Sequence, residues 1–246
     1  MVNKQELYKQ IGNLRKKYLK SINNITIWHS KVIEALKYAE SDDSFINQEN
    51  YSVVSTNKGV TNVKRNPDDM RTIINRASSF ESYYAIFSYI VAIVESFLQE
   101  YLNIELHSDK RKVKIRINGI NFESKIDVDV ILDSEHLENI IDDIINKNIY
   151  SVFYASPKLQ LDYLHKVSGI EIPEDLFKKW IEIKASRDLI IHNQGIINMI
   201  YLSKVDEHLI RGKLDEKIVI VKLYFENSVR AIKSLVGKIC SMTQKK

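Results

Sequence analysis

Residues that interrupt secondary structure are scarce in this sequence. It contains 7 glycines and 3 prolines in 246 residues. Because these two residues most often end helices and strands, their scarcity predicts long helices joined by few connections. Cysteine is nearly absent as well, since Cys240 is the only one. This excludes a disulfide within the chain and a zinc site built from cysteines, and it suits a reducing compartment.

Long apolar runs are also missing. The longest, over residues 83–98, is interrupted by Ser88, Glu95 and Ser96. It is shorter than the roughly 20 apolar residues that a membrane-spanning helix needs. Residues 1–7 contain no apolar core of a signal peptide. We therefore expect a cytoplasmic protein that has no membrane partner.

The charge of the chain is nearly balanced. The formal net charge is +4, which permits an anionic partner without requiring one. Two basic clusters could contact nucleic acid: the run Arg15-Lys16-Lys17 and the alternating Lys112, Lys114 and Arg116. An ordinary solvated face explains such clusters more often, so neither is assigned a function from the sequence.

Apolar residues at spacings of three and four predict helices along most of the chain. A long helix is expected over 4–40, and a helix that is apolar on most sides over 79–103. Further helices are expected over 67–77, 135–148, 157–168, 173–192, 197–210 and 214–242. Without internal repeats or a low-complexity linker, residues 1–246 form a single predicted domain with its core at about 67–242.

Residues 111–126 break the helical pattern. Apolar and basic residues alternate over 112–117, and Asn118-Gly119 is a preferred pair for a tight hairpin turn. We expect a small β-hairpin at about 111–126, inserted between helices. The polar segment 41–66 is expected to be a loop with one short strand-like piece. The predicted fold class is therefore all-α, a multi-helix bundle with one inserted β-hairpin.

One short apolar segment carries an unusual number of polar groups. On a helix, Lys184, Asp188 and His192 share one face at a spacing of four, and Arg187 lies one step away. Asp188 is placed to hydrogen-bond a ring nitrogen of His192 and to fix its tautomer. Asn193 adds a neutral donor and acceptor beside the imidazole.

A further carboxylate, Glu95, lies inside the apolar helix expected over 79–103. A carboxylate in such a helix costs free energy unless it is paired or lies at a surface. Either Glu95 pairs with a basic group elsewhere in the fold, or it faces the polar segment 184–193. The sequence leaves both interpretations open.

This set of residues suits the cleavage of RNA without a metal ion, in which the 2′-hydroxyl of RNA attacks the adjacent phosphate. Histidine transfers protons near neutral pH, and arginine stabilises the extra charge on the phosphate. The 6 histidines have no zinc-type spacing, and no phosphate-binding loop or dinucleotide fingerprint occurs. We expect neither a metal nor a cofactor.

The stretch from Arg187 to His192, Arg-Asp-Leu-Ile-Ile-His, resembles the R-x4–6-H signature of the HEPN superfamily. The resemblance extends over about 78–105 and 134–212, to bacterial members found in defence and toxin settings. The residues around the signature that carry it are Glu95, Ser156-Pro157, Asn193, Gly195, Asn198 and Tyr201.

The resemblance implies a helical bundle that dimerises so that two R-x4–6-H motifs face each other. It implies metal-independent RNA cleavage that leaves a 2′,3′-cyclic phosphate and a 5′-hydroxyl. Such a protein acts as a toxin or an antiviral effector, with an antitoxin or a defence protein as its partner. The resemblance makes Arg187 and His192 catalytic and Asp188 their supporting polar residue, and it assigns contacts in the cleft or with RNA to Glu95, Lys184 and Asn193.

Two alternatives remain beside a homodimeric RNA endonuclease. The chain could be a HEPN-type helical module that binds RNA, a nucleotide or a protein partner and does not cut. It could also be an unrelated helical protein in which Arg187 and His192 form a buried structural bridge. The insertion at 105–130 departs from the family pattern, and it leaves the shape of the cleft open.

Overall fold

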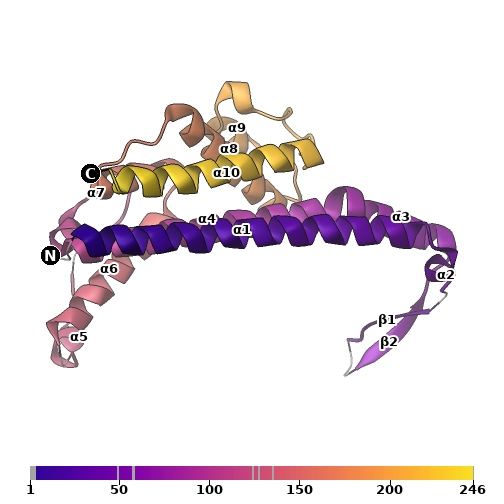
Figure 1. The fold of residues 1–246 in the computed structure, drawn as a ribbon, viewed down its shortest axis with the longest axis horizontal. Coiled ribbons are helices and arrows are strands. Elements are labelled where there is room, and N and C mark those ends of the chain that lie inside the picture. Colours follow the sequence, from indigo (N-terminus) through magenta and orange to yellow (C-terminus); the bar gives the residue numbers. More distant parts are fainter. Residues whose placement is uncertain are drawn as a thin grey trace.

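The fold is a bundle of helices, as the composition predicts (Figure 1). A computed structural model describes residues 4–48, 50–56, 59–123, 125–126, 128–134 and 136–245. The main helices are α1 Lys4–Glu40, α3 Pro67–Arg76, α4 Ser82–Ser108, α6 Leu137–Tyr154, α7 Pro157–Ser168, α8 Glu174–His192, α9 Met199–Lys204 and α10 Lys222–Thr243. Shorter elements are α2 Asp43–Ile46, α5 Val128–Leu132, the 3-10 turns η2 Lys110–Lys114 and η3 Glu207–Leu209, and the π turn η1 Ala77–Glu81.

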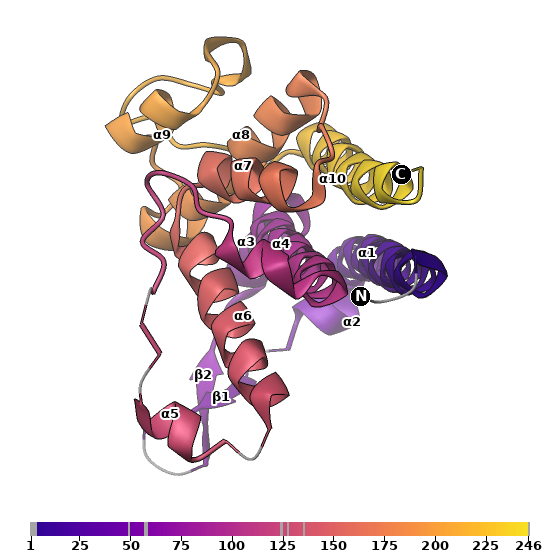
Figure 2. The same cartoon turned by 90° about the vertical axis from the view of Figure 1, so that its left-hand side faces the viewer.

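Helix α4 is the centre of the bundle. It packs against α1, α6, α7, α8 and α10, and its side chains Val91, Val94, Phe97 and Tyr101 are completely buried. Figures 1 and 2 show α10 lying along α1, with α4 beside them. One continuous cluster of buried residues joins these helices, so the apolar face of each helix is buried against its neighbours.

The stretch Pro67–Ser108 runs through α3, η1 and α4 as one helical segment. It is long and apolar enough to cross a membrane by length and composition, and half of its most apolar 18 residues are buried inside the protein. The core helix of a soluble protein has the same composition, and α4 packs against α1, α8 and α10.

Several predicted helices are confirmed with nearly the expected boundaries. Helix α1 begins and ends where the periodicity predicts, and α7 lies between its cap Ser156 and the left-handed Gly169, whose φ is 62°. Other boundaries shift: α6 extends further than expected, α9 is shorter, and α10 begins at Lys222. The segment before α10 is extended and pairs at Lys217 with Ile196.

The β-hairpin is present, but the predicted position at 111–126 is wrong. Strands β1 Asn50–Val54 and β2 Val60–Lys64 pair antiparallel within the segment that was expected to be a loop. Figure 1 shows this hairpin projecting from the end of α1. Its side chains are mostly exposed, with Val54 at 88%.

Residues 111–126, of which residue 124 lies outside the described chain, pack against the helices as an irregular segment. It begins with η2, and its apolar residues Ile115, Ile117, Ile120 and Phe122 contact the core. Lys112 turns inward to the buried Glu105, with Nζ 2.5 Å from Oε2. The alternating pattern therefore falls on a 3-10 turn and on the irregular stretch that follows it, whose apolar side chains lie on the core, and no second strand pairs with it in the part that the structure describes.

Candidate functional site

Helix α8 positions the polar segment. Leu176, Trp180 and Ile183 are buried on one side of the helix, and Pro173 precedes its first residue. The helix ends in a left-handed turn, with φ of 53° at Gln194 and 78° at Gly195. The N–H of Gly195 donates to the carbonyl oxygen of Leu189 at 2.8 Å, which closes the helix end. The end of α8 is thus fixed in direction.

Glu95 of α4 faces the polar segment, which confirms one of the two interpretations of this carboxylate. Lys184 Nζ donates to Glu95 Oε1, and Arg187 Nη2 donates to Glu95 Oε2 at 2.5 Å. The other side of the guanidinium lies 3.3 Å from Asp188, measured from Nη1 to Oδ1. Two cations and two carboxylates therefore form one charge cluster between α4 and α8.

The burial of this cluster makes its contacts energetically important. The exposed fraction is 10% for the side chain of Lys184, 17% for that of Arg187 and 18% for that of Glu95. Because water screens such charges poorly, each cation depends on the carboxylate between them. Arg187 Nε is buried and has no hydrogen-bond partner among the described residues. A phosphate that binds Arg187 must therefore compete with Glu95 and Asp188.

His192 behaves differently from Arg187. It is the last residue of α8, its side chain is exposed, and no hydrogen bond to it is found within the described chain. The predicted hydrogen bond from Asp188 to His192 is wrong, because the carboxylate lies against the neighbouring guanidinium. The interpretation of Arg187 and His192 as a buried bridge is also wrong. Arg187 is held inward and His192 faces solvent.

Asn193 has a local structural role. Its side-chain Nδ2 donates to the carbonyl oxygen of Ile196 at 2.6 Å, and its backbone N–H donates to Leu189. These contacts hold the turn that follows His192. Large apolar side chains are exposed beside this turn, with Ile191 at 55%, Met199 at 65% and Ile200 at 60%. Such a group of exposed apolar side chains is typical of a contact surface.

A second polar network on α8 was missed by the sequence analysis. The carboxylate of Glu182, with 5% exposure, accepts hydrogen bonds from Ser186 at 2.6 Å, Tyr224 at 2.7 Å and Tyr201 at 3.3 Å. The guanidinium of Arg211 lies over the Tyr224 ring, 3.3 Å from its centroid. The spacing of four between Glu182 and Ser186 in a buried helix was the available signal.

Burial raises the pKa of Glu182 above its ordinary value of 4.5, although the hydroxyl donors and Arg211 oppose this shift. A raised folded pKa means that the native state binds more protons, so stability falls as the pH rises from about 4.5 through the folded pKa. We expect Glu182→Gln to remove this decrease in the free energy of unfolding. Urea denaturation between pH 4.5 and 8 measures the free energy of unfolding at each pH. The control is Glu207→Gln, which changes an exposed carboxylate. Equal pH dependence in the wild type and Glu182→Gln would contradict the assignment.

Comparison with known proteins gives no relative. No family model, no curated protein and no solved structure matches this chain. In the part of the chain that the structure describes, no three His, Cys, Asp or Glu side chains gather closely enough to bind a metal ion. The resemblance to the HEPN superfamily therefore stays a prediction from the sequence, carried by the R-x4–6-H motif and the residues around it.

Proposed function

We propose that this protein is a metal-independent RNA endonuclease that acts as a cytoplasmic toxin or antiviral effector. The observation that carries the proposal is an exposed imidazole, His192, at the end of the helix on which Glu95 fixes Arg187. An exposed imidazole suits proton transfer with a bound substrate, and the guanidinium on the same helix suits an anionic phosphate.

The proposed active form is a homodimer. Within one chain Arg187 points inward and His192 outward, so a single copy supplies one proton-transfer group at most. Cleavage needs a base for the 2′-hydroxyl and an acid for the leaving group. Two copies related by a twofold axis supply both. The exposed Ile191, Met199 and Ile200 beside the motif offer an apolar contact for the second copy.

In the proposed dimer the reaction uses the two facing motifs. One neutral His192 takes the proton of the 2′-hydroxyl, and the 2′-oxygen attacks the adjacent phosphorus. The bond from phosphorus to the 5′-oxygen breaks, and the partner copy's protonated imidazole gives a proton to that oxygen. Arg187 stabilises the added negative charge on the phosphate. The products are a 2′,3′-cyclic phosphate and a 5′-hydroxyl.

The test is incubation of the purified protein with total cellular RNA in the presence of EDTA. We expect cleavage products whose 5′ ends a polynucleotide kinase labels without prior phosphatase treatment. His136→Ala, which changes an exposed histidine at the start of α6, is the matched control and should cut normally. Intact RNA with the wild type, or full cleavage by His192→Ala, contradicts the proposal.

Dimerisation gives a separate prediction. Ile200→Glu places a charge on an exposed apolar residue near the motif, where it should not affect folding. We expect the variant to be a monomer by light scattering and to lose RNA cleavage, since the partner histidine is then missing. The exposed Leu132→Glu, on α5, is the control. A monomeric wild type that cuts RNA would show that one copy suffices.

One observation favours the second candidate function, a HEPN-type module that binds RNA, a nucleotide or a protein without cutting. Both sides of the Arg187 guanidinium are occupied by protein carboxylates. In that case His192→Ala binds its ligand as the wild type does, and the wild type leaves RNA intact.

A further inference from the structure

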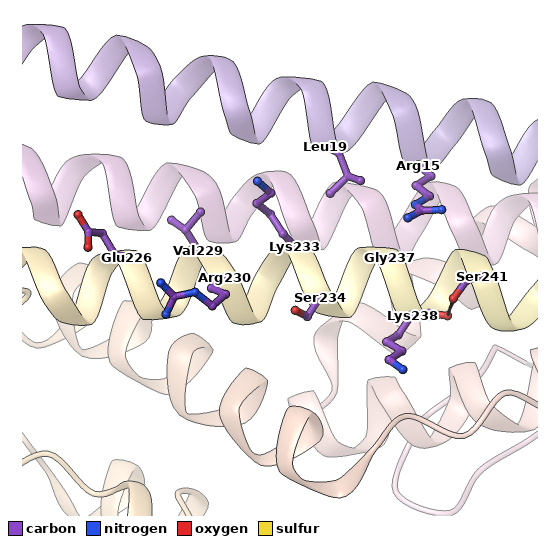
Figure 3. Close-up of a pocket in the computed structure, with 10 residues that line it drawn as sticks. All are labelled: Arg15, Leu19, Glu226, Val229, Arg230, Lys233, Ser234, Gly237, Lys238 and Ser241. Atoms are coloured by element: carbon purple, nitrogen blue, oxygen red, sulfur yellow. Dashed lines mark hydrogen bonds between the residues drawn. The ribbon is translucent and has the colours of Figure 1, made fainter.

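A groove between α1 and α10 lies outside the proposed cleavage site. Its volume is about 650 Å³, and its walls carry Arg15 from α1 and Arg230, Lys233 and Lys238 from α10 (Figure 3). Figure 3 shows Arg15 reaching from α1 toward α10. Arg15 belongs to the basic run that the sequence left without a function, and the fold brings it opposite three more cations.

No carboxylate that the structure describes neutralises these four cations. Arg15, Lys233 and Lys238 form no ion pair with a carboxylate in the described chain, and Arg230 Nη1 donates only to the amide oxygen of Asn227 at 2.6 Å. Several cations elsewhere are neutralised at short distances: Lys17 by Glu100, Lys31 by Glu34, Arg76 by Glu81 and Lys110 by Glu138. The groove therefore concentrates uncompensated positive charge.

Carboxylates are almost excluded from the groove. Glu226 is the acidic residue among its lining side chains, and it stands toward one end, 3.9 Å from Lys222. A Cβ atom at Gly237 would lie 4.0 Å from Arg15 Nη2, which is an ordinary van der Waals distance. With four cations and one carboxylate among its described lining residues, the groove favours an anion.

The cations form a row that continues on the other side of α10. Arg230, Ser234 and Lys238 follow at a spacing of four, which covers about 12 Å along the helix. The same three residues line a second groove of about 650 Å³ between α10 and α8, where Lys179 pairs with Asp175 at 3.6 Å and Arg211 interacts with the buried Glu182. The row therefore borders two grooves, and cations outnumber carboxylates among the described residues that line each of them.

The row leads toward the proposed cleavage site. Glu182 of α8 contacts Tyr224 near the start of α10, and Leu176 lies beside Leu235 further along. The two helices therefore run antiparallel, and α8 continues past the beginning of α10 to His192. A chain that follows the row from Lys238 through Arg230 approaches the end of α8.

We propose that the row Arg230–Ser234–Lys238, together with Arg15 and Lys233, binds the sugar-phosphate backbone of single-stranded RNA. Uncompensated cations recognise phosphates, and the serine hydroxyl is a further donor. Among the described residues that line the groove between α1 and α10 there is no aromatic side chain, so bases find no stacking surface in this groove and we expect the contact not to depend on sequence. This inference rests on the proposed RNA endonuclease, and it assigns the path of the substrate outside the cleavage site.

The test measures the binding of a short fluorescein-labelled single-stranded RNA by anisotropy, in a His192→Ala background that prevents cutting. We expect the double variant Arg230→Gln/Lys238→Gln to bind about tenfold more weakly at low salt, and to reduce the slope of log affinity against log salt by about 0.7 per cation removed. The control is Lys31→Gln/Lys110→Gln, which removes the same charge from ion pairs elsewhere. Equal losses in the two double variants would overturn the inference.

Further measurements of cleavage and binding separate this inference from the proposed function. With an intact His192, Arg230→Gln/Lys238→Gln should cut a dinucleotide at the wild-type rate, because this substrate does not reach the row. If the wild type cuts RNA and the double variant binds it unchanged, the inference alone fails. If RNA binding depends on the row but nothing is cut, the endonuclease proposal fails alone. Binding of phosphatidylserine vesicles without binding of RNA would overturn the inference in favour of a membrane surface.

Discussion

His192→Ala is expected to slow RNA cleavage by about 10²–10⁴-fold, the range for a lost proton-transfer group. Its free energy of unfolding should stay within about 0.5 kcal/mol of the wild type, because the imidazole is exposed and has no hydrogen bond in the described chain. Single-turnover cleavage of a short RNA and urea denaturation measure the two quantities. This combination separates a chemical role from a structural one.

Arg187→Ala should differ from His192→Ala in its free energy of unfolding. Its cleavage rate should fall by about 10²–10³-fold, the range for a lost donor to a developing charge. It should also lose about 1–3 kcal/mol of stability, because the guanidinium fills a largely buried place beside Glu95. If both variants lost stability equally, or if neither lost activity, the assigned roles of the two residues would be wrong.

Glu95→Ala is expected to be among the most destabilising single changes in the protein. It leaves Lys184 and Arg187, both largely buried, facing each other without the carboxylate that separates them. Removing one partner of such a group costs about 3 kcal/mol or more. Glu95→Gln keeps the shape and tests the charge alone, and it should lose most of the same stability.

The matched control for Glu95→Gln is Glu100→Gln on the same helix. Glu100 pairs with Lys17 at 2.7 Å, but the two side chains are 44% and 61% exposed. An exposed pair of this kind contributes about 0–1 kcal/mol. Urea denaturation at neutral pH compares the two variants, and a loss in Glu95→Gln no larger than in Glu100→Gln would mean that the cluster does not stabilise the fold.

The boundaries of α1 and α7 were predictable because each has a local cause in the sequence. Proline and glycine bound α7, and the apolar period sets the length of α1. For Glu95, the sequence predicts only that a carboxylate in an apolar helix is paired or lies at a surface, and it leaves open whether the partner is the polar segment 184–193.

The remaining features depend on which of several possible partners a side chain contacts in the fold. Asp188 could have bonded His192, but its carboxylate pairs with the guanidinium of Arg187 at 3.3 Å. The alternation over 112–117 predicts a strand, but residues 110–114 form a 3-10 turn and Lys112 pairs with the buried Glu105. The groove between α1 and α10 depends on Arg15 being brought opposite α10, which only the packing of the two helices decides.

The length of α1 has a practical consequence for measuring the oligomeric state. A helix of 37 residues is about 55 Å long, whereas a compact chain of this size has a radius of gyration of about 18 Å, or a diameter near 46 Å. The hairpin projects to the side at the end of α1, so a monomer diffuses more slowly than a sphere of the same mass (Figure 1). Elution from a gel-filtration column would therefore overestimate the mass of the monomer, and a direct determination of mass distinguishes one copy from two.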